Sequence, residues 1–163
     1  MTAGSKSLSA SLNAPKLPDN LFAVTDIDAE LSKVREAESD FIAADFSRLI
    51  CDSNDFSSLY FKNCLFKGNR FTACDFSKCT FIDCVFKGCD ISNCNFTESY
   101  FRACSFTSCK AVGAAFKDSY HKNVSFDGGS FELSDFQRSK LQSVLITDTD
   151  FSSCLLYTSP SPR

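Results

Sequence analysis

The sequence lacks the features that mark most enzymes and cofactor-binding proteins. Its 163 residues include no tryptophan, one methionine and one histidine. No dinucleotide-binding GxGxxG, P-loop, HExxH or GxSxG pattern occurs. We therefore expect a protein that is not an enzyme and that holds no cofactor and no metal.

Long apolar runs are also absent. No segment is long and apolar enough to cross a bilayer, and the N-terminal stretch MTAGSKSLSASLNAP lacks the apolar region of a secretory signal. We expect a cytoplasmic protein without membrane contact, in a compartment that keeps thiols reduced. The net charge of −3 is mild and predicts no direct contact with nucleic acid.

Phenylalanine and cysteine, in contrast, are abundant, with 18 and 10 residues. Seventeen of the 18 phenylalanines have numbers that leave remainder 1 on division by five; only Phe22 does not. A regular spacing of large apolar side chains predicts one buried ladder. The predicted large core residues of this register are Phe46, Phe56, Phe61, Phe66, Phe71, Phe76, Phe81, Phe86, Ile91, Phe96, Phe101, Phe106, Phe116, Phe126, Phe131 and Phe136.

A second register, of small side chains, lies two residues before the first. It holds eight cysteines, which we expect to be free thiols acting as small buried residues. A metal site would need ligands that converge on one tetrahedral centre, whereas successive cysteines of this register fall on different faces. Spacing alone leaves a disulfide between neighbouring coils open, although a reducing compartment argues against it. The eight are Cys64, Cys74, Cys79, Cys84, Cys89, Cys94, Cys104 and Cys109.

A period of five fits neither a helix nor a simple strand. The pattern small–x–large places two side chains on one face of a short extended segment, and three further residues must then turn the chain. Non-core residues recur at steps of 20, so four segments make one coil. We predict an all-β, four-sided solenoid over residues 41–153, with about five to six coils and a height of roughly 25–30 Å.

The remaining segments differ in composition. Residues 1–18 are rich in Ser, Ala and Pro and predict a flexible leader. Residues 19–40 carry seven acids against two bases. We expect them to form a short strand or helical turn that caps the first coil, because an open coil end exposes unpaired strand edges.

The last ten residues, CLLYTSPSPR (154–163), resemble the translation of a sequencing-library adapter. We expect a non-native tail here, with the natural gene continuing past Ser153 into further coils. The chain as given should then self-associate through its open C-terminal edge. The full-length protein would have the option of a homodimer through that end.

Four segments show the repeat most clearly: NDFSS (54–58), CDFSK (74–78), CNFTE (94–98) and SDFQR (134–138). They resemble the repeats of the pentapeptide-repeat protein family. The resemblance covers residues 41–153 and implies a right-handed quadrilateral parallel β-helix. The Phe- and Cys-rich repeats are similar to those of the Qnr-like quinolone-resistance proteins, which bind DNA gyrase and topoisomerase IV, so the resemblance implies a protein partner of this kind.

Two lines of exposed side chains are the candidate partner-binding residues. Aspartate and asparagine can bond the backbone of the turns or imitate the phosphates of DNA. The tyrosines can stack between coils or form a binding stripe. The first line is Asp55, Asp75, Asn95 and Asp135, interrupted by Ala115, and the second is Tyr60, Tyr100 and Tyr120.

His121 is the only histidine and occupies a large core position of the register. A catalytic role would need partners in a cleft, and we predict a core residue instead. Three functions remain open: a protein-binding module of Qnr type that binds gyrase or topoisomerase IV, a structural or scaffold β-helix, and an enzyme or metal protein. The first is our leading interpretation.

Overall fold

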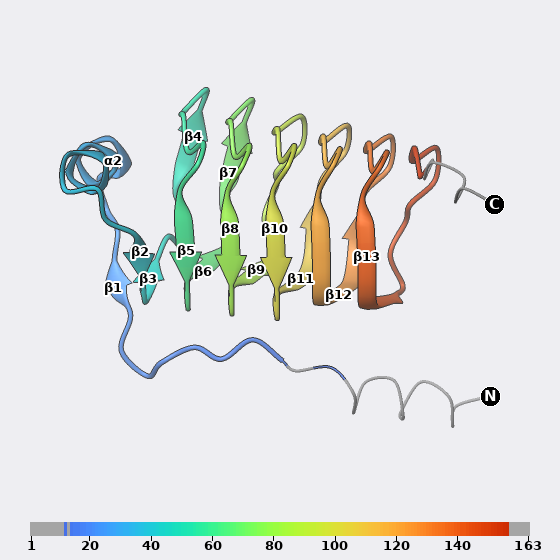
Figure 1. Cartoon of the computed structure of the whole chain (residues 1–163), viewed down its shortest axis with the longest axis horizontal. Helices are drawn as coiled ribbons and strands as arrows, with labels where there is room; N and C mark the ends of the chain where they lie inside the picture. Colours follow the sequence, from blue (N-terminus) through green and yellow to red (C-terminus); the bar gives the residue numbers. More distant parts are fainter. Residues whose placement is uncertain (1–11, 13, 157–163) are drawn as a thin grey trace.

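The computed structural model describes residue 12 and residues 14–156 of the chain. They form a four-sided column of stacked coils with helix α2 (Ile27–Glu36) at its N-terminal end (Figure 1). The fold is a right-handed quadrilateral parallel β-helix of about six turns, as the repeat predicts. Every strand pair is parallel and joins residues 20 apart within the coils, for example Phe61 with Phe81 and Phe101 with His121.

We number the four faces in chain order. Face 1 contains the strands centred on Phe61 and the residues in register with it, and face 2 those centred on Phe66. On face 1 lie β2 (Phe41–Ile42), β5 (Tyr60–Lys62), β8 (Thr80–Ile82), β10 (Tyr100–Arg102) and the first parts of β12 (Tyr120–Ser130) and β13 (Lys140–Thr147). On face 2 lie β3 (Ala44–Asp45), β6 (Leu65–Lys67), β9 (Val85–Lys87), β11 (Ser105–Lys110) and the later parts of β12 and β13, with β1 (Phe22–Ala23) paired to β3 at the edge.

Faces 3 and 4 are bonded more sparsely. Face 3, centred on Phe71, has strands β4 (Ile50–Asp52) and β7 (Arg70–Thr72), single bridges through Asp90 and Asp150, and the ends of β11 and β12, which pair Lys110 with Ser130. Face 4, centred on Phe76, consists of single bridges alone, from Asp55 through to Leu155. All four faces therefore stack in register, although two of them carry most of the regular strand.

The corners are made by one residue in five. From Ala43 to Ser153, every fifth residue has a φ between 48° and 73°, in the left-handed region. Only four of these residues are glycine, although side chains with a Cβ seldom adopt this conformation. The backbone stays bonded through the corner, since the Asn63 N–H donates to the Ile82 carbonyl at 3.0 Å and Asp83 to Arg102 at 3.1 Å. This continuous bonding offsets the local strain.

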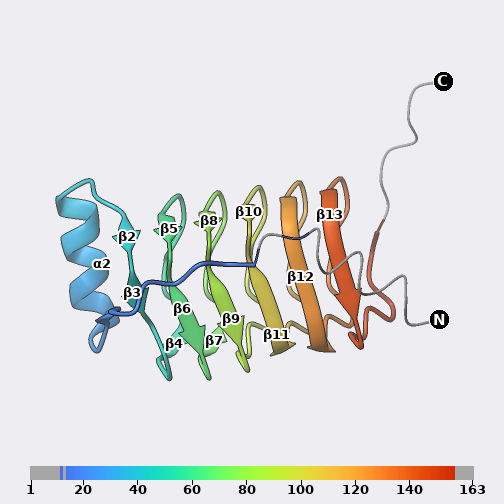
Figure 2. The same ribbon diagram turned by 90° about the horizontal axis from the view of Figure 1, so that it is seen from below.

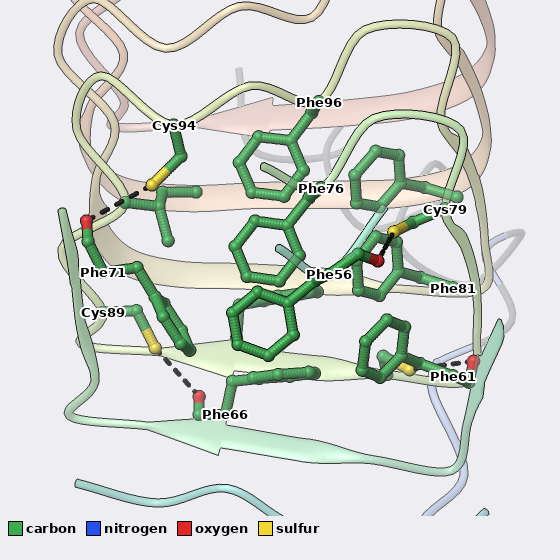
Figure 3. Close-up of a cluster of buried hydrophobic side chains, with 14 of the residues drawn as sticks. Phe56, Phe61, Phe66, Phe71, Phe76, Cys79, Phe81, Cys89, Cys94 and Phe96 are labelled. Atoms are coloured by element: carbon green, nitrogen blue, oxygen red, sulfur yellow. Dashed lines mark hydrogen bonds between the residues drawn. The ribbon is translucent and has the colours of Figure 1, made fainter. Parts of the chain in front are cut away.

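The interior is filled by stacked phenylalanine rings (Figure 3). Along a face the rings lie nearly parallel: Phe56 and Phe76 are 4.5 Å apart with an interplanar angle of 4°. Between faces they meet edge to face, as Phe61 and Phe66 do at 5.7 Å and 62°. Both arrangements are the favourable ones for aromatic pairs. The structure places all the large core residues and cysteines predicted above in the interior, at most 2% exposed.

The small register has a second role that its size alone does not predict. Each thiol donates a hydrogen bond to the carbonyl of the core residue 23 positions earlier, for example Cys79 to Phe56 at 2.9 Å and Cys89 to Phe66 at 3.1 Å (Figure 3). Ser99 makes the same bond to Phe76 at 2.7 Å. These side chains therefore satisfy buried carbonyls of the core residues, which would be costly to leave unpaired.

The segment predicted as a cap contains both elements that we considered. Strand β1 extends the face 2 sheet, and α2 is a full ten-residue helix whose Leu31 and Val34 are buried against the first coil. The Asp26 carboxylate caps the helix by accepting from the Ala29 N–H at 3.1 Å. Arg35 ties the helix to the column by donating to the Asp55 carbonyl at 2.9 Å.

The predicted flexible leader differs in its described part. Residues 14–18, which we call the strap, lie along the column at the corner between faces 1 and 2 (Figure 2). Pro15 and Leu17 are half-buried, whereas Ala14, Lys16 and Pro18 are exposed. The physical reason is that contacts to coils far along the chain hold these residues, and composition does not report such contacts. Residues 1–11 and 13 of the leader lie outside the described residues.

The predicted non-native tail begins inside the column. The Leu155 N–H donates to the Ser134 carbonyl at 2.9 Å, and Phe136 donates to Leu155 at 2.7 Å. Cys154 and Leu156 have the numbers and side-chain sizes of the small and large registers, which explains why 154–156 continue the coil. Residues 157–163 lie outside the part of the chain that the structure describes.

Candidate partner-binding surface

The described residues contain no concentrated chemical site. Within residues 12 and 14–156, no three histidine, cysteine, aspartate or glutamate side chains come together to hold a metal. In the same part of the chain, no helix is long and apolar enough to cross a membrane. The candidate site is therefore the outer surface of the column, where the two predicted lines lie.

The tyrosine line runs along the outside of face 1. Its rungs are Tyr60, Thr80, Tyr100, Tyr120 and Lys140. The Tyr100 and Tyr120 rings are 5.2 Å apart, whereas Thr80 separates Tyr60 from Tyr100. The structure thus brings two of the three predicted tyrosines into contact and leaves the third two coils away.

Two polar side chains contact Tyr120, one member of the aromatic pair. Lys140 Nζ lies 4.9 Å from the centre of the Tyr120 ring, a cation–π contact. The Tyr120 hydroxyl donates to Gln142 Oε1. Both tyrosines are only half-buried, so this stretch presents flat aromatic area with polar edges, a combination that is enriched at protein interfaces.

The aspartate line runs along face 4, and its members are stacked in consecutive bridges. Each side chain accepts a hydrogen bond from the N–H two residues on: Asp55 from Ser57 and Asp75 from Ser77, both at 2.8 Å. Asn95 and Asp135 make the same bond at 3.0 Å. The line thus performs the turn-bonding role that its residue types favour.

Charge on the aspartate line is partly compensated. Hydrogen bonds from Ser57 and then the nearby Arg35 hold the pKa of Asp55 below its usual range, and Lys117 lies 4.0 Å from Asp135. Ala115 interrupts the line between Asn95 and Asp135. The line is therefore a poor copy of evenly spaced phosphates, although its members are reachable from solvent.

His121 lies in the core at the position of a phenylalanine. Its ring stacks on Phe101 at 4.7 Å and is fully buried, and Nε2 lies 3.0 Å from Ser119 Oγ. Ser119 and Ser139 each donate to the Phe116 carbonyl at 2.6 Å, so Ser119 accepts from Nε2–H and the Nδ1 lone pair has no partner. Burial lowers the pKa of His121 to about 3. No substrate could reach it.

The cysteines are equally enclosed. All ten are free thiols, and nine of them are buried. Burial raises the pKa of Cys79 to about 12 and that of Cys84 well above its ordinary value. A thiol that stays protonated at neutral pH donates hydrogen bonds but is a weak nucleophile and metal ligand. Hydrogen bonds with Cys94 and Cys109 lower the pKa of Cys74 and Cys89, but both side chains are only 1% exposed. Burial therefore keeps the ladder structural.

Some of the residues that matter were not predicted. Asn69, 2% exposed, occupies the small register and donates to the Phe46 carbonyl in the manner of the thiols. Asn63 and Asp83 hold the main chain of Lys16. The only sequence signal for the last pair is that a side chain able to donate, Asn63, and a side chain that accepts, Asp83, lie 20 residues apart at one corner.

The family model described as Pentapeptide repeat region matches residues 79–159. The chain belongs to the pentapeptide-repeat family. No curated protein matches the chain in sequence.

Three solved structures illustrate the likeness. QnrB1, a plasmid-mediated fluoroquinolone resistance protein, is 20% identical with a TM-score of 0.47, over 70% of this chain and 66% of that one. A pentapeptide repeat protein of the Arabidopsis thaliana thylakoid lumen is 22% identical with a TM-score of 0.46, over 56% and 66%. Rfr23 from the cyanobacterium Cyanothece 51142 is 7% identical with a TM-score of 0.44, over 81% and 100%.

Proposed function

We propose that this chain is a non-catalytic protein-binding module that binds DNA gyrase or topoisomerase IV and protects it from quinolones, in the manner of Qnr proteins. The observation that carries the proposal is the half-exposed Tyr100–Tyr120 pair on a column whose core is packed solid with aromatic rings. A rigid column binds with little loss of conformational entropy, since its surface is already in place. The choice of partner follows the resemblance of the Phe- and Cys-rich repeats to those of the Qnr-like proteins.

A gyrase supercoiling assay with a fluoroquinolone present tests this function. Titrating the chain should restore supercoiling at stoichiometric amounts. The double variant Tyr100→Ala with Tyr120→Ala should lose this rescue, because it removes the aromatic area. Thr80→Ala, on the same face and in the same register, is the matched control and should keep it. Decatenation by topoisomerase IV provides the parallel assay.

A structural or scaffold role is the alternative, and one observation favours it. The side chains of the aspartate line accept hydrogen bonds from the backbone of their own turns, as Asp75 does from the Ser77 N–H at 2.8 Å. If the chain neither rescues nor inhibits supercoiling at stoichiometric amounts, the topoisomerase proposal fails and the scaffold interpretation replaces it.

A further inference from the structure

The strap is held by its main chain. The Lys16 N–H donates to Asp83 Oδ1 at 3.2 Å, and Asn63 Nδ2 donates to the Lys16 carbonyl at 2.5 Å. Asn63 and Asp83 occupy the same corner of consecutive coils, both with positive φ. Two coils together thus bind the donor and the acceptor of a single extended residue. Such contacts recognise a peptide backbone whatever its side chains are.

Apolar side chains add to this main-chain hold. Alternate strap residues, Pro15 and Leu17, are half-buried, as expected for an extended peptide lying on a surface. Ile82 points outward from face 1 but is only 4% exposed, whereas Ile42, at the same position of the first coil, is 52% exposed. Ile82 directly precedes Asp83, which binds the strap, so the low exposure of Ile82 falls on the stretch of the corner where the strap lies.

The corner continues along the column beyond the strap contacts as a track with two unlike walls. We define the corner track by its corner residues and by the side chains on either side of them. The corner residues are Asn63, Asp83, Ala103, Asn123 and Ser143. The face 1 wall is Lys62, Ile82, Arg102 and Lys122, and the face 2 wall is Leu65, Val85, Ser105, Ser125 and Leu145.

The strap leaves part of the track unfilled. One hollow of about 270 Å³ lies between Lys16, Asp83, Arg102 and Asn123. A second hollow of about 300 Å³ lies beside Pro15 and is lined by Ser105, Ser125 and Leu145 among others. The strap is therefore seated firmly at coils bearing Asn63 and Asp83 and loosely at the later coils.

We propose that the corner track is a docking site for an extended peptide of a partner protein, one with alternating apolar and acidic side chains, and that the strap is its displaceable resident. Asn63 and Asp83 would form hydrogen bonds with the main chain of the peptide, and the face 2 wall would contact its apolar side chains. The acidic side chains meet the basic side chains of face 1. The inference rests on the proposed function as a binding module but requires no topoisomerase.

Charge explains why a partner would displace the strap. Lys16, the exposed centre of the strap, shares a hollow with Arg102, a like charge, and with Asp83, whose carboxylate already accepts from the Lys16 N–H. The face 1 wall adds Lys62 and Lys122 to Arg102, so every charged side chain of that wall is basic. An acidic residue would therefore meet opposite charge along this wall, and complementary charge favours the partner over the resident.

The test uses the full chain and a fluorescent peptide of residues 12–20, LNAPKLPDN, in which Lys16→Glu replaces the basic centre. The receptor is the strap-weakened chain Pro15→Gly with Leu17→Gly, which lacks the two half-buried side chains. We expect at least tenfold tighter binding to this chain than to the native chain, because the strap no longer competes. Adding Asn63→Ala or Asp83→Ala should weaken binding about tenfold.

Asn93→Ala is the matched control. It changes an asparagine with the same positive φ at the opposite corner of the column and should leave binding unchanged. Alanine already occupies this turn position at Ala43, Ala73 and Ala103, so the variants should fold, which circular dichroism would verify. Loss of the gyrase rescue with intact peptide binding would reject the topoisomerase proposal alone.

Four results would overturn the docking site. The first is equal binding to the native and strap-weakened chains, and the second is equal loss with Asn93→Ala and Asn63→Ala. The third is tighter binding of the unchanged Lys16 peptide, which would make the occupant the leader of a second copy. No binding at millimolar peptide would likewise reject it, whatever the supercoiling assay shows.

Discussion

At the scale of single residues, Phe86 shows what the aromatic ladder contributes. It is 1% exposed and stacks between Phe66 and Phe106, each at 4.6 Å. Phe86→Ala should lower the free energy of unfolding by about 3–5 kcal/mol, because it leaves a cavity that rigid neighbours cannot close. Urea denaturation measures the change, and a loss below about 1 kcal/mol would contradict its central burial.

Two glycines provide a matched comparison of space and strain. A Cβ on Gly129 would lie 2.1 Å from the Cys109 carbonyl oxygen, and the φ there is +97°. A Cβ on Gly88 would meet nothing within 4 Å, at a φ of +60°. Gly129→Ala should prevent stable folding, whereas Gly88→Ala should cost about 1–2 kcal/mol for the left-handed conformation alone. Thermal unfolding of both variants measures the difference. Similar midpoints for the two variants would refute it.

His121 is the residue through which acid should weaken the fold. Its pKa is lowered to about 3 by burial, whereas an unfolded histidine titrates near 6.5. Below about pH 6.5 the unfolded chain binds a proton that the native chain refuses. Stability is therefore complete above pH 6.5 and declines towards pH 3, by up to about 1.4 kcal/mol per pH unit from this residue.

His121→Phe isolates that contribution. The variant extends the stack from Phe101 and removes the unpaired Nδ1, so it should gain about 1–2 kcal/mol at pH 8. Its advantage should grow as the pH falls from 6.5, since the aspartates titrate alike in both proteins. Parallel stability curves from pH 8 to pH 4 would show that His121 is not the acid-sensitive group.

At the scale of elements, helix α2 depends on its cap. Asp26 accepts from the Ala29 N–H at 3.1 Å, and Leu31 and Val34 pack on the first coil. Asp26→Ala should lower stability by about 1 kcal/mol by leaving a helix N–H unsatisfied. Hydrogen exchange should show faster opening of the helix with the later coils unchanged. Uniform acceleration along the column would mean that the cap stabilises the whole fold.

How far the elements could be predicted depends on the range of their contacts. The coils can be predicted from the sequence alone. Phe66, Phe86 and their equivalents each pack on the phenylalanine at the same position of the next repeat, so the repeat itself reports the contact. The strap could not be predicted, since Lys16 meets Asp83 across 67 positions without any repeat that relates them. The helix was predicted only as a short turn, because the apolar pattern around Leu31 is brief.

The candidate surface was predictable in position but not in use. Steps of 20 placed the Tyr and Asp lines on their faces. Whether Asp75 faces a partner or its own turn depends on the Ser77 N–H at 2.8 Å, a detail of backbone geometry. Likewise the hydrogen bonds of the thiols, such as Cys79 to Phe56, depend on where the carbonyls of the core residues point, which no side-chain pattern reveals.

At the scale of the whole molecule, the C-terminal end of the column is apolar. Leu141, Ile146 and Leu156 lie in the core register but are 45%, 50% and 53% exposed. We expect the chain to self-associate there because, within residues 14–156, these exposed apolar side chains lie on and beside β13, whose pairing is with β12. Light scattering should show dimers or larger species that Leu141→Lys with Ile146→Lys reduces. A monodisperse monomer at high concentration would contradict this.

The one-dimensional bonding of the coils also has a mechanical consequence. Each coil pairs only with the coils directly before and after it, as Phe81 pairs with Phe61 and Phe101. When the column is pulled by its two termini, it should unfold from one end, one coil at a time. Each turn of 20 residues would lengthen the tether by roughly 60–70 Å, which is its extended length less one rung. A force–extension curve of such a molecule would show unfolding steps of equal length.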